Sequence, residues 1–290
     1  MSSQPSIRTQ FIILVVFGDV IAPRGGRVWT SGLLKLLRLL GVSERAARSA
    51  LSRMSRKGWL KTERHGRHSA YMLTPRGERL LSEGDLRIFE PRMSGWDGQW
   101  HMVVYSLPES RRRLRNDLRR RLNWLGFGRL APGAWISPND RQQEVQTALD
   151  DLDARPFVQV FSGIQLTGGD NRAVVNKCWD LKALNRRYAR FLARWAPEHE
   201  KFKSLHAQGQ DLSQAKCFVQ RFWIAHEYSA FPRLDPNLPP GLLPEGWLGD
   251  RAARVFETYR ELLSEGAASY VTESLRRPNG RGSSNGGEDT

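Results

Sequence analysis

The stretch Gly41–Leu60, GVSERAARSALSRMSRKGWL, decides how the N-terminal part of this chain should fold. At 100° per residue it predicts a helix with one arc of apolar side chains, formed by Ala46, Ala47, Ala50, Leu51 and Met54. The opposite arc alternates arginine with serine and holds Arg45, Arg48, Ser49, Ser52 and Arg56, with Arg53 at its edge. Ser43 is placed to cap the helix N-terminus, and Glu44 is favourable in the first turn.

The segments on either side extend this prediction. The preceding segment, TSGLLKLLRLLG, has leucines at helical spacing, and the link Gly41–Val42 allows only a tight turn between the two helices. This pattern, with a basic second helix, is typical of a helix-turn-helix. After it, Trp59–Thr74 alternates apolar and polar residues around RHGRH, which predicts a β-hairpin with Gly66 at its tip. Together the elements predict a winged helix-turn-helix.

Such a module binds DNA through its second helix and its wing. Arginine can form paired hydrogen bonds to guanine, whereas phosphate contacts give salt-dependent affinity without sequence information. The predicted DNA-binding residues are Arg45, Arg48, Ser49, Ser52, Arg53 and Arg56 of the helix and Arg64, His65, Arg67 and His68 of the hairpin. A solvated helix face and a solvated turn are the alternative interpretations of the same residues. The pattern leaves open which arginine contacts a base and which a phosphate.

Composition supports a folded, basic protein. The 290 residues, 40% of them hydrophobic, are enough for two or three domains. The formal net charge is +15, and the first 90 residues hold 16 Lys and Arg against 7 Asp and Glu. A basic region of this kind favours a polyanionic partner, and on charge alone an acidic membrane surface would serve as well as DNA.

Cysteine usage and hydropathy predict the compartment. Cys178 and Cys217 lie far apart without metal-ligand spacing, which favours a reducing, cytoplasmic environment. The apolar run Phe11–Phe17 is far shorter than the roughly 20 residues that span a bilayer, so we expect a buried helix and no membrane contact. The histidines lack metal spacing, and we predict neither a metal site nor a catalytic site.

Punctuation by Gly and Pro divides the rest of the chain. A boundary is expected in Glu90–Trp100, after a winged helix-turn-helix domain over residues 1–90. Residues 91–170 alternate strand and helix patterns, which predicts a small α+β sandwich. Residues 171–275 are mainly helical, and residues 276–290 have the composition of a disordered tail. The predicted fold class is therefore α+β multidomain.

Several blocks of sequence also carry a family resemblance. The order PRGGRVW, GVSERAARSALSRMSRKGWL, GRHSAYMLTPRG and WDGQWHMVVYSLPESRRRLRNDLRRRLNWLGFGRLAPGAWISP resembles the phenylacetic acid degradation operon repressor (PaaX) family. The likeness runs from about residue 8 to residue 275. It implies a transcriptional repressor and not an enzyme, with a winged helix, a ferredoxin-like middle domain and a helical C-terminal domain. It also implies an operator in a catabolic promoter, phenylacetyl-CoA or a related aryl-CoA as inducer, and no cofactor.

The middle domain suggests an enzymatic alternative, because its plan resembles small CRISPR-associated ferredoxin-like nucleases. Those nucleases place an acidic residue at the end of the first strand to hold a divalent metal. Here Ser106 stands at that place, and a hydroxyl cannot replace a carboxylate as the main ligand of a hard cation. We therefore expect the scaffold without the chemistry and interpret Asp97 as a turn residue. A metal-dependent nuclease and a nonspecific nucleic-acid-binding protein remain the alternatives.

A second arginine-rich segment, Arg111–Leu125, predicts a helix with leucines on one stripe and seven arginines around it. A solvated face is one interpretation, and contact with a partner subunit, DNA or the phosphates of an acyl-CoA are others. Our effector-binding candidates are Arg115 and Arg119. The C-terminal tryptophans predict core packing, with an aryl pocket as the alternative. We also expect a homodimer on a palindromic operator, with residues 171–275 serving dimerisation and effector binding. Inducer binding and operator binding should each weaken the other, so the inducer releases the protein from the operator.

Overall fold

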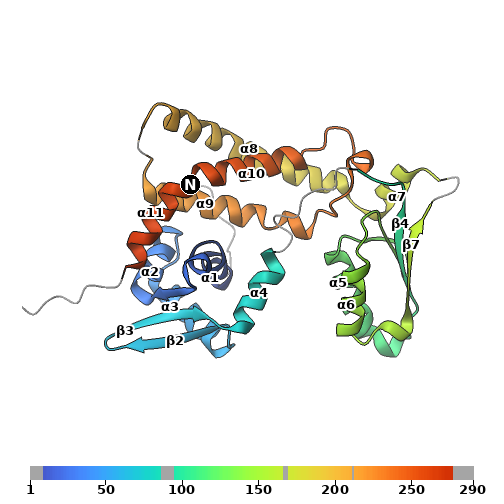
Figure 1. Cartoon of the computed structure of the whole chain (residues 1–290), viewed down its shortest axis with the longest axis horizontal. Helices are drawn as coiled ribbons and strands as arrows, with labels where there is room; N and C mark the ends of the chain where they lie inside the picture. Colours follow the sequence, from blue (N-terminus) through green and yellow to red (C-terminus); the bar gives the residue numbers. More distant parts are fainter. Residues whose placement is uncertain (1–8, 86–94, 166–168, 211, 277–290) are drawn as a thin grey trace, which may run out of the picture. The chain divides into compact units, whose positions relative to one another are not determined.

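A computed structural model of the chain describes residues 9–85, 95–165, 169–210 and 212–276 (Figure 1). The described residues form a mixed α+β structure with two antiparallel sheets, which confirms the predicted class at that level. The contacts form two compact units. Unit 1 comprises Met1–Gly84, Glu200–His226 and Thr258–Thr290, and unit 2 comprises Asp85–His199 and Glu227–Glu257. None of the described helices combines the length and apolarity needed to cross a bilayer.

Unit 1 begins with helices and a small sheet. Its N-terminal elements are α1 (Thr9–Val16), the short helical turns η1 (Phe17–Ile21) and η2 (Ala22–Arg24), β1 (Arg27–Trp29), α2 (Thr30–Leu39), α3 (Glu44–Arg56), β2 (Leu60–His65), β3 (His68–Leu73) and α4 (Pro75–Asp85). The predicted buried first helix is confirmed, because Ile13 and Val16 of α1 are fully buried. Unit 1 also takes parts of α8 (Leu181–Ala207), α9 (Gln214–Tyr228) and α10 (Gly249–Leu262), and α11 (Ser264–Leu275).

Helices α2 and α3 form as their leucine and alanine spacing predicts. The leucine stripe of α2 and its C-terminal turn is buried, and the α3 residues with 0% exposure are Ala47, Ala50, Leu51 and Met54. Ala46 was expected on the same stripe but is half-buried, because it lies at the edge of the arc in the first turn. The N-terminus of α3 is capped as predicted, since the Ser43 hydroxyl accepts a hydrogen bond from the Ala46 N–H at 3.3 Å.

The predicted hairpin is strands β2 and β3, with His65 opposite His68. Gly66 has φ +59°, the left-handed conformation that a two-residue hairpin loop needs at its first central position. A third strand, β1, pairs with β3 and gives the order β1-β3-β2. Sequence analysis did not predict β1, because a three-residue strand is too short to show an alternation.

Unit 2 contains a four-stranded antiparallel sheet in the order β5-β6-β4-β7. Its elements are β4 (Trp100–Tyr105), η3 (Glu109–Arg111), α5 (Arg112–Trp124), β5 (Gly128–Ala131), β6 (Ala134–Ser137), α6 (Gln142–Asp151), η4 (Arg155–Phe157), β7 (Val158–Ile164) and α7 (Asn171–Cys178). The remaining parts of α8, α9 and α10 and the turns η5 (Phe231–Arg233) and η6 (Pro240–Leu242) complete it. The predicted strands and helices are present, but β5 was missed.

Helices α5 and α6 cover one face of this sheet (Figure 1). The core between them includes Val103, Leu118, Trp135 and Leu149. Leu114, expected in the buried stripe of α5, is only partly buried against this core.

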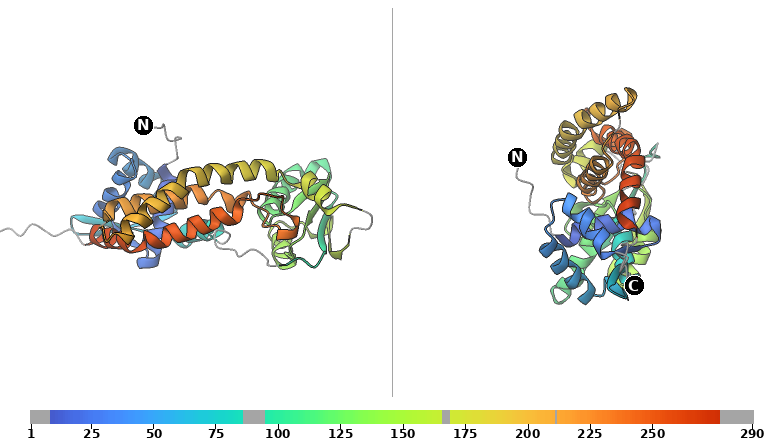
Figure 2. Two further views of the ribbon diagram at one scale, coloured as in Figure 1. Left: turned by 90° about the horizontal axis from the view of Figure 1, so that it is seen from above. Right: turned by 90° about the vertical axis from the view of Figure 1, so that its left-hand side faces the viewer.

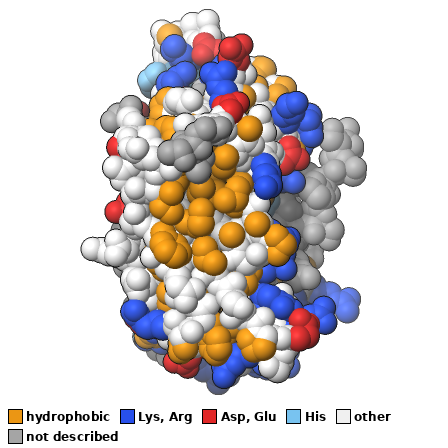
Figure 3. Space-filling model, turned by 90° about the vertical axis from the view of Figure 1, so that its right-hand side faces the viewer, with side chains coloured by type: hydrophobic (Ala, Val, Ile, Leu, Met, Phe, Trp, Pro, Cys, Tyr) orange, Lys and Arg blue, Asp and Glu red, His pale blue; other side chains and the backbone are white. Residues whose placement is uncertain are grey.

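The other face of the sheet carries apolar side chains on β4 and at Phe161 of β7. Met102 and Val104 alternate with the core residues of β4, and their neighbour Phe161 on β7 is 47% exposed. At β5 the same face is covered, since a Cβ atom at Gly128 would meet Cys178 and Trp179 at 2.6 Å. Figure 3 shows hydrophobic side chains gathered near the middle of this side of unit 2.

The C-terminal helices differ from the prediction in two places. Within residues 171–275 the sequence predicts one helix over residues 176–195 and a closing helix near residues 251–265. The first is divided between α7 and α8, and the second is α10 followed by an unpredicted α11. In unit 1, α11 lies beside α2 (Figures 1 and 2). A side chain at Gly32 of α2 would clash with the backbone carbonyl oxygen of Ser274, so a glycine is required at this close approach.

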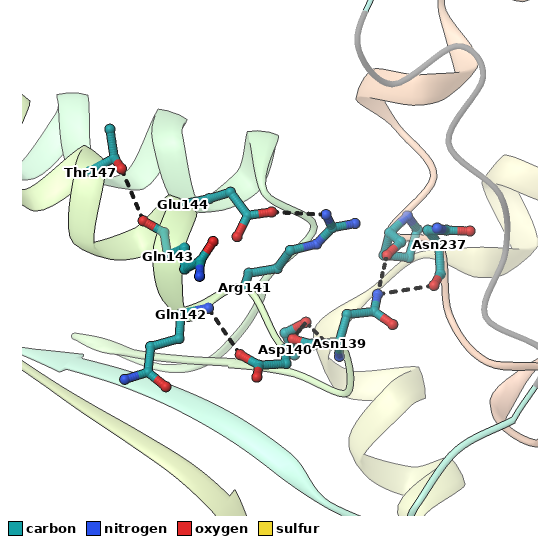
Figure 4. A network of polar contacts seen from close by, with 10 residues as sticks. Asn139, Asp140, Arg141, Gln142, Gln143, Glu144, Thr147 and Asn237 are labelled. Atoms are coloured by element: carbon teal, nitrogen blue, oxygen red, sulfur yellow. Dashed lines mark hydrogen bonds and ion pairs between the residues drawn. The ribbon is translucent and has the colours of Figure 1, made fainter.

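In unit 2 a buried amide holds the proline-rich loop. Asn139, 3% exposed, donates from its side-chain nitrogen to the backbone carbonyls of Pro236 at 3.2 Å and Asn237 at 3.0 Å (Figure 4). The division into units differs from the predicted domains. Both units include residues from the C-terminal third of the chain, whereas the predicted boundaries make residues 171–275 one domain. Those boundaries stay predictions, and residues 90–94 of the boundary segment and 277–290 of the expected tail lie outside the described residues.

Candidate nucleic-acid interface

The outer face of α3 is arranged as the sequence predicts. The six candidate residues on this helix are all exposed to solvent: Arg45, Arg48, Ser49, Ser52, Arg53 and Arg56. They lie opposite the buried stripe, so packing of α3 into unit 1 leaves the arginines and serines outward. Serine is short enough for the helix backbone to approach a groove, while arginine reaches base edges or phosphates.

Two contacts organise the arginines of this face. The Arg48 guanidinium donates to the Glu44 carboxylate at 2.9 Å, and Arg53 donates to the Ser49 hydroxyl at 2.6 Å. Arg38 of α2 lies 3.8 Å from the other oxygen of Glu44. Ion pairs at the surface contribute only about 0–1 kcal/mol, so phosphates can replace Glu44 at low cost.

The hairpin tip holds the other four candidates. Arg64, His65 and Arg67 are exposed, and His68 is half-buried. The rings of both histidines meet the edge or face of Trp29, with centroid distances of 5.5 Å for His65 and 6.3 Å for His68. The tip is therefore packed against β1 and is held by aromatic contacts as well as by its strand pairing.

A cavity of about 410 Å³ lies between α2, the start of α3 and the hairpin tip. It brings together the predicted residues Arg48, Arg67 and His68 with others that sequence analysis did not select, namely Thr30, Ser31, Leu34, Lys35, Arg38 and Ser69, and with Glu44. Lys35 and Arg38 were missed because α2 was interpreted only through its leucines. Their spacing of three residues on the polar side of that helix was the available signal.

The two effector candidates on α5 are not brought together in a described cavity. Arg115 donates to Glu109 at 2.7 Å, and this hydrogen bond holds the pKa of the Glu109 carboxyl below its usual value. Arg119 is exposed. An open hollow of about 380 Å³ beside α5 is lined instead by other residues of α5 and α6, including Arg121 and Trp124.

The positions weighed for metal chemistry have structural contacts. Ser106 follows β4, is exposed, and donates its backbone N–H to the Phe157 carbonyl at 3.1 Å. Asp97 accepts a hydrogen bond from the Gln99 N–H at 2.9 Å, which confirms its role in a turn. Among the described residues, no group of three or more His, Cys, Asp or Glu is arranged to hold a metal ion.

Both cysteines are free thiols, and burial raises the pKa of Cys178 to about 11. Core packing is confirmed for two of the C-terminal tryptophans, since Trp195 is 1% and Trp223 9% exposed. Trp195 also donates its indole N–H to Glu227 at 2.7 Å. Each ring is therefore buried within its own unit, Trp195 in unit 2 and Trp223 in unit 1.

Comparison with known proteins gives matches along most of the chain. Family models described as PaaX-like protein, PaaX protein central Cas2-like domain and PaaX-like protein C-terminal domain match residues 8–77, 93–175 and 179–273. Transcriptional repressor PaaX of Escherichia coli (strain K12) is 31% identical over 266 residues, which cover 90% of this chain and 82% of that protein.

A solved structure shares the fold. Uncharacterized protein Rv0674 from Mycobacterium tuberculosis is 22% identical, with a TM-score of 0.61 over 93% of this chain and 99% of that one. The E. coli relative is named as a repressor, which agrees with the prediction of a regulator and not an enzyme. On the identity, the coverage and the three matching models, the chain belongs to the PaaX family.

Proposed function

We propose that this protein is a sequence-specific DNA-binding repressor of an aromatic, phenylacetate-type catabolic operon, and that an aryl-CoA thioester such as phenylacetyl-CoA releases it from its operator. The observation that carries the proposal is the outer face of α3, where arginines and serines are exposed opposite a fully buried stripe. The name of the E. coli relative supports the repressor role.

Two finer assignments of fold support this role. Helices α2 and α3 followed by the β2–β3 hairpin have the order of a winged helix-turn-helix, whose second helix enters the major groove. In unit 2 the strand order β5-β6-β4-β7 with two intervening helices has the β-α-β-β-α-β plan of a ferredoxin-like domain. We assign the two folds on these orders.

Protection mapping on the promoter nearest the protein's own gene tests the proposal. We expect one protected region at a physiological salt concentration, with little protection of random DNA, and loss of protection when phenylacetyl-CoA is added. A panel of free and CoA-linked aromatic acids identifies the effector class. Equal affinity for operator and random DNA would favour the nonspecific alternative, and protection unaffected by every thioester would remove the induction mechanism.

For the effector we propose that Arg115 and Arg119 contribute to binding the phosphates of the CoA moiety, because arginine forms planar pairs of hydrogen bonds with phosphate. Titration calorimetry of phenylacetyl-CoA with Arg115→Ala and Arg119→Ala should show weaker binding than with the wild type. Arg113→Ala, which changes an exposed arginine on the same helix, is the matched control. Unchanged affinity in both variants would exclude these residues.

The remaining proposals concern assembly and location. We propose a cytoplasmic homodimer on a palindromic site, since paired helix-turn-helix modules match half-sites about one DNA turn apart. The mass of the free protein and the spacing of protected half-sites test this. Incubation of the protein with labelled DNA and Mg²⁺ or Mn²⁺ should give no cleavage, because Ser106 cannot serve as the acidic ligand of a nuclease metal.

A further inference from the structure

The cavity between α2, α3 and the hairpin tip concentrates positive charge from three separate elements. Lys35 and Arg38 come from α2, Arg48 from α3 and Arg67 from the hairpin. Like charges repel, so four cations around one hollow favour an anionic occupant. The glycine turn and the hairpin bring these residues together, although they are up to 32 positions apart in the sequence.

The N-terminus of α2 adds a positive partial charge to the same cavity, which Thr30 and Ser31 also line. Its N-cap residue is Trp29, whose indole nitrogen can donate but cannot accept a hydrogen bond from the first backbone N–H groups. The Thr30 hydroxyl contacts the Ser69 carbonyl oxygen at 2.9 Å, which ties the start of α2 to β3. The first turn of α2 is therefore a fixed wall of the cavity.

Two carboxylates compensate the cations in the free protein. Glu44 lies 2.8 Å from Arg48 and 3.8 Å from Arg38. Glu273 of α11 lies 3.4 Å from Lys35, whose ammonium also sits 5.0 Å from the centre of the Tyr270 ring. The side chains in these pairs are roughly half to three-quarters exposed, so the pairs are weak and exchangeable.

We propose that this cavity binds one backbone phosphate of DNA, and that Glu44 and Glu273 form ion pairs with its cations until that phosphate binds. The inference rests on the proposed DNA binding and adds a defined phosphate site to it. DNA is the favoured source of the phosphate because Arg48 of α3 and Arg67 and His68 of the hairpin tip line the cavity and are also predicted DNA-binding residues. Such a contact fixes the register of α3 without reading a base.

Neutral substitution of the cations tests the site. The substitutions Arg38→Gln and Lys35→Gln are made separately in the full-length protein. Each should weaken binding to the operator and to a random duplex by the same factor, roughly tenfold at 0.1 M salt for one lost phosphate contact. The slope of log K against log salt concentration should become shallower by about 0.9. Lys203→Gln, an exposed lysine of α8 in the same unit, is the control and should change neither quantity.

Glu44→Gln should act in the opposite direction. Removing the competing carboxylate should tighten binding to both duplexes and steepen the salt dependence, because Arg38 and Arg48 then exchange only water and counterions. Glu44 also stabilises the first turn of α3, so the melting temperature is measured in parallel. Weaker binding by a variant that melts as the wild type does would overturn the proposed competition.

A modified duplex locates the phosphate. With single phosphates replaced in turn by uncharged methylphosphonate, the wild type should lose affinity at several positions, and Arg38→Gln should be insensitive at one of them. If Arg38→Gln loses the same factor as the wild type at every position, the proposed seat is wrong while DNA binding stands. If the wild type binds no duplex, the proposed function itself fails.

Inorganic phosphate distinguishes the other source of the same chemistry. A seat for a free phosphate would give a saturable rise in melting temperature with inorganic phosphate in the wild type, absent in Arg38→Gln, together with unchanged DNA binding by that variant. That outcome would overturn the assignment to DNA. We expect no such saturation in the millimolar range, because Glu44 and Glu273 compete with a free phosphate for the cations of the cavity.

Discussion

Helices α3 and α5 are both thirteen residues long and rich in arginine, but their charged faces are built differently. On α3 the arginines alternate with serines, and Glu44 is the one acidic residue in its sequence. On α5 there are no serines, and three of its arginines contact acids, namely Glu109, Asp117 and Asp151. Each helix has one acidic residue of its own, Glu44 or Asp117, so the two faces differ in the serines of α3 and in the acids from other elements that pair with α5. Arginine content alone therefore does not distinguish the two faces.

The buried faces of the two helices should behave alike, which sets the baseline of the comparison. Leu51 of α3 and Leu118 of α5 are both 0% exposed. Leu51→Ala and Leu118→Ala should each lower the free energy of unfolding by about 2–5 kcal/mol, because each leaves a cavity in a packed core. Urea unfolding measures this. Leu39→Ala, at a leucine that is 38% exposed, is the control, and a loss below that of the control would contradict the packing.

The outer faces should differ in DNA binding. Arg53→Ala on α3 should weaken operator binding by about 1–3 kcal/mol, a range that covers a lost base contact and the roughly tenfold loss of a phosphate contact. Arg119→Ala on α5 should change it by less than about 0.5 kcal/mol, as expected for an exposed substitution away from the interface. Fluorescence anisotropy at one fixed salt concentration measures both. Equal losses would abolish the distinction between the helices and place α5 at the DNA as well.

The helix N-termini should differ in stability. Ser43 caps α3, whereas the N-cap residue of α5, Arg111, makes no side-chain capping bond. Ser43→Ala should therefore cost about 1 kcal/mol and speed hydrogen exchange in the first turn of α3. Ser52→Ala, on the exposed face of the same helix, should leave stability unchanged or slightly raised, since alanine favours the helix interior. Slower exchange after Ser43→Ala would contradict the capping role.

The smallest effect is expected at the acids around α5. The hydrogen bond from Arg115 lowers the pKa of Glu109 below the usual 4.5, so its charge stabilises the folded state at neutral pH and that contribution is lost as the pH falls through the lowered pKa. Glu109→Gln should thus melt slightly lower than the wild type at pH 7, and the difference should shrink as the pH is lowered towards 3. Melting curves across this range measure it, and a difference that grows towards acid would refute the ion pair.

The elements with long periodic patterns were predictable from the sequence. The stripes of α2 and α3 and the hairpin around Gly66 follow from spacing and turn chemistry. Strands β1 and β5 were not, because three or four residues carry no detectable period. Helix α11 was missed because its small and polar residues give only a weak apolar face.

The candidate site was predicted in part for a related reason. A pattern along one helix selects residues of that helix, and it found the outer face of α3 and the hairpin tip. The cavity is assembled from α2, α3 and β3, and Lys35 and Arg38 join it only through the tertiary arrangement. Glu273, which contacts Lys35, is 238 positions further along the chain, and no local pattern connects the two.

The close approach of α11 to α2 has a consequence for engineering. The absence of a side chain at Gly32 lets the backbone of Ser274 approach directly, so α2, a helix of the proposed DNA-binding module, has one side shaped to fit α11. Grafting residues 1–90 onto another regulator would uncover that side and release Lys35 from Glu273. A hybrid regulator made from this protein should therefore include α11 together with residues 1–90, although the two segments are far apart in the sequence.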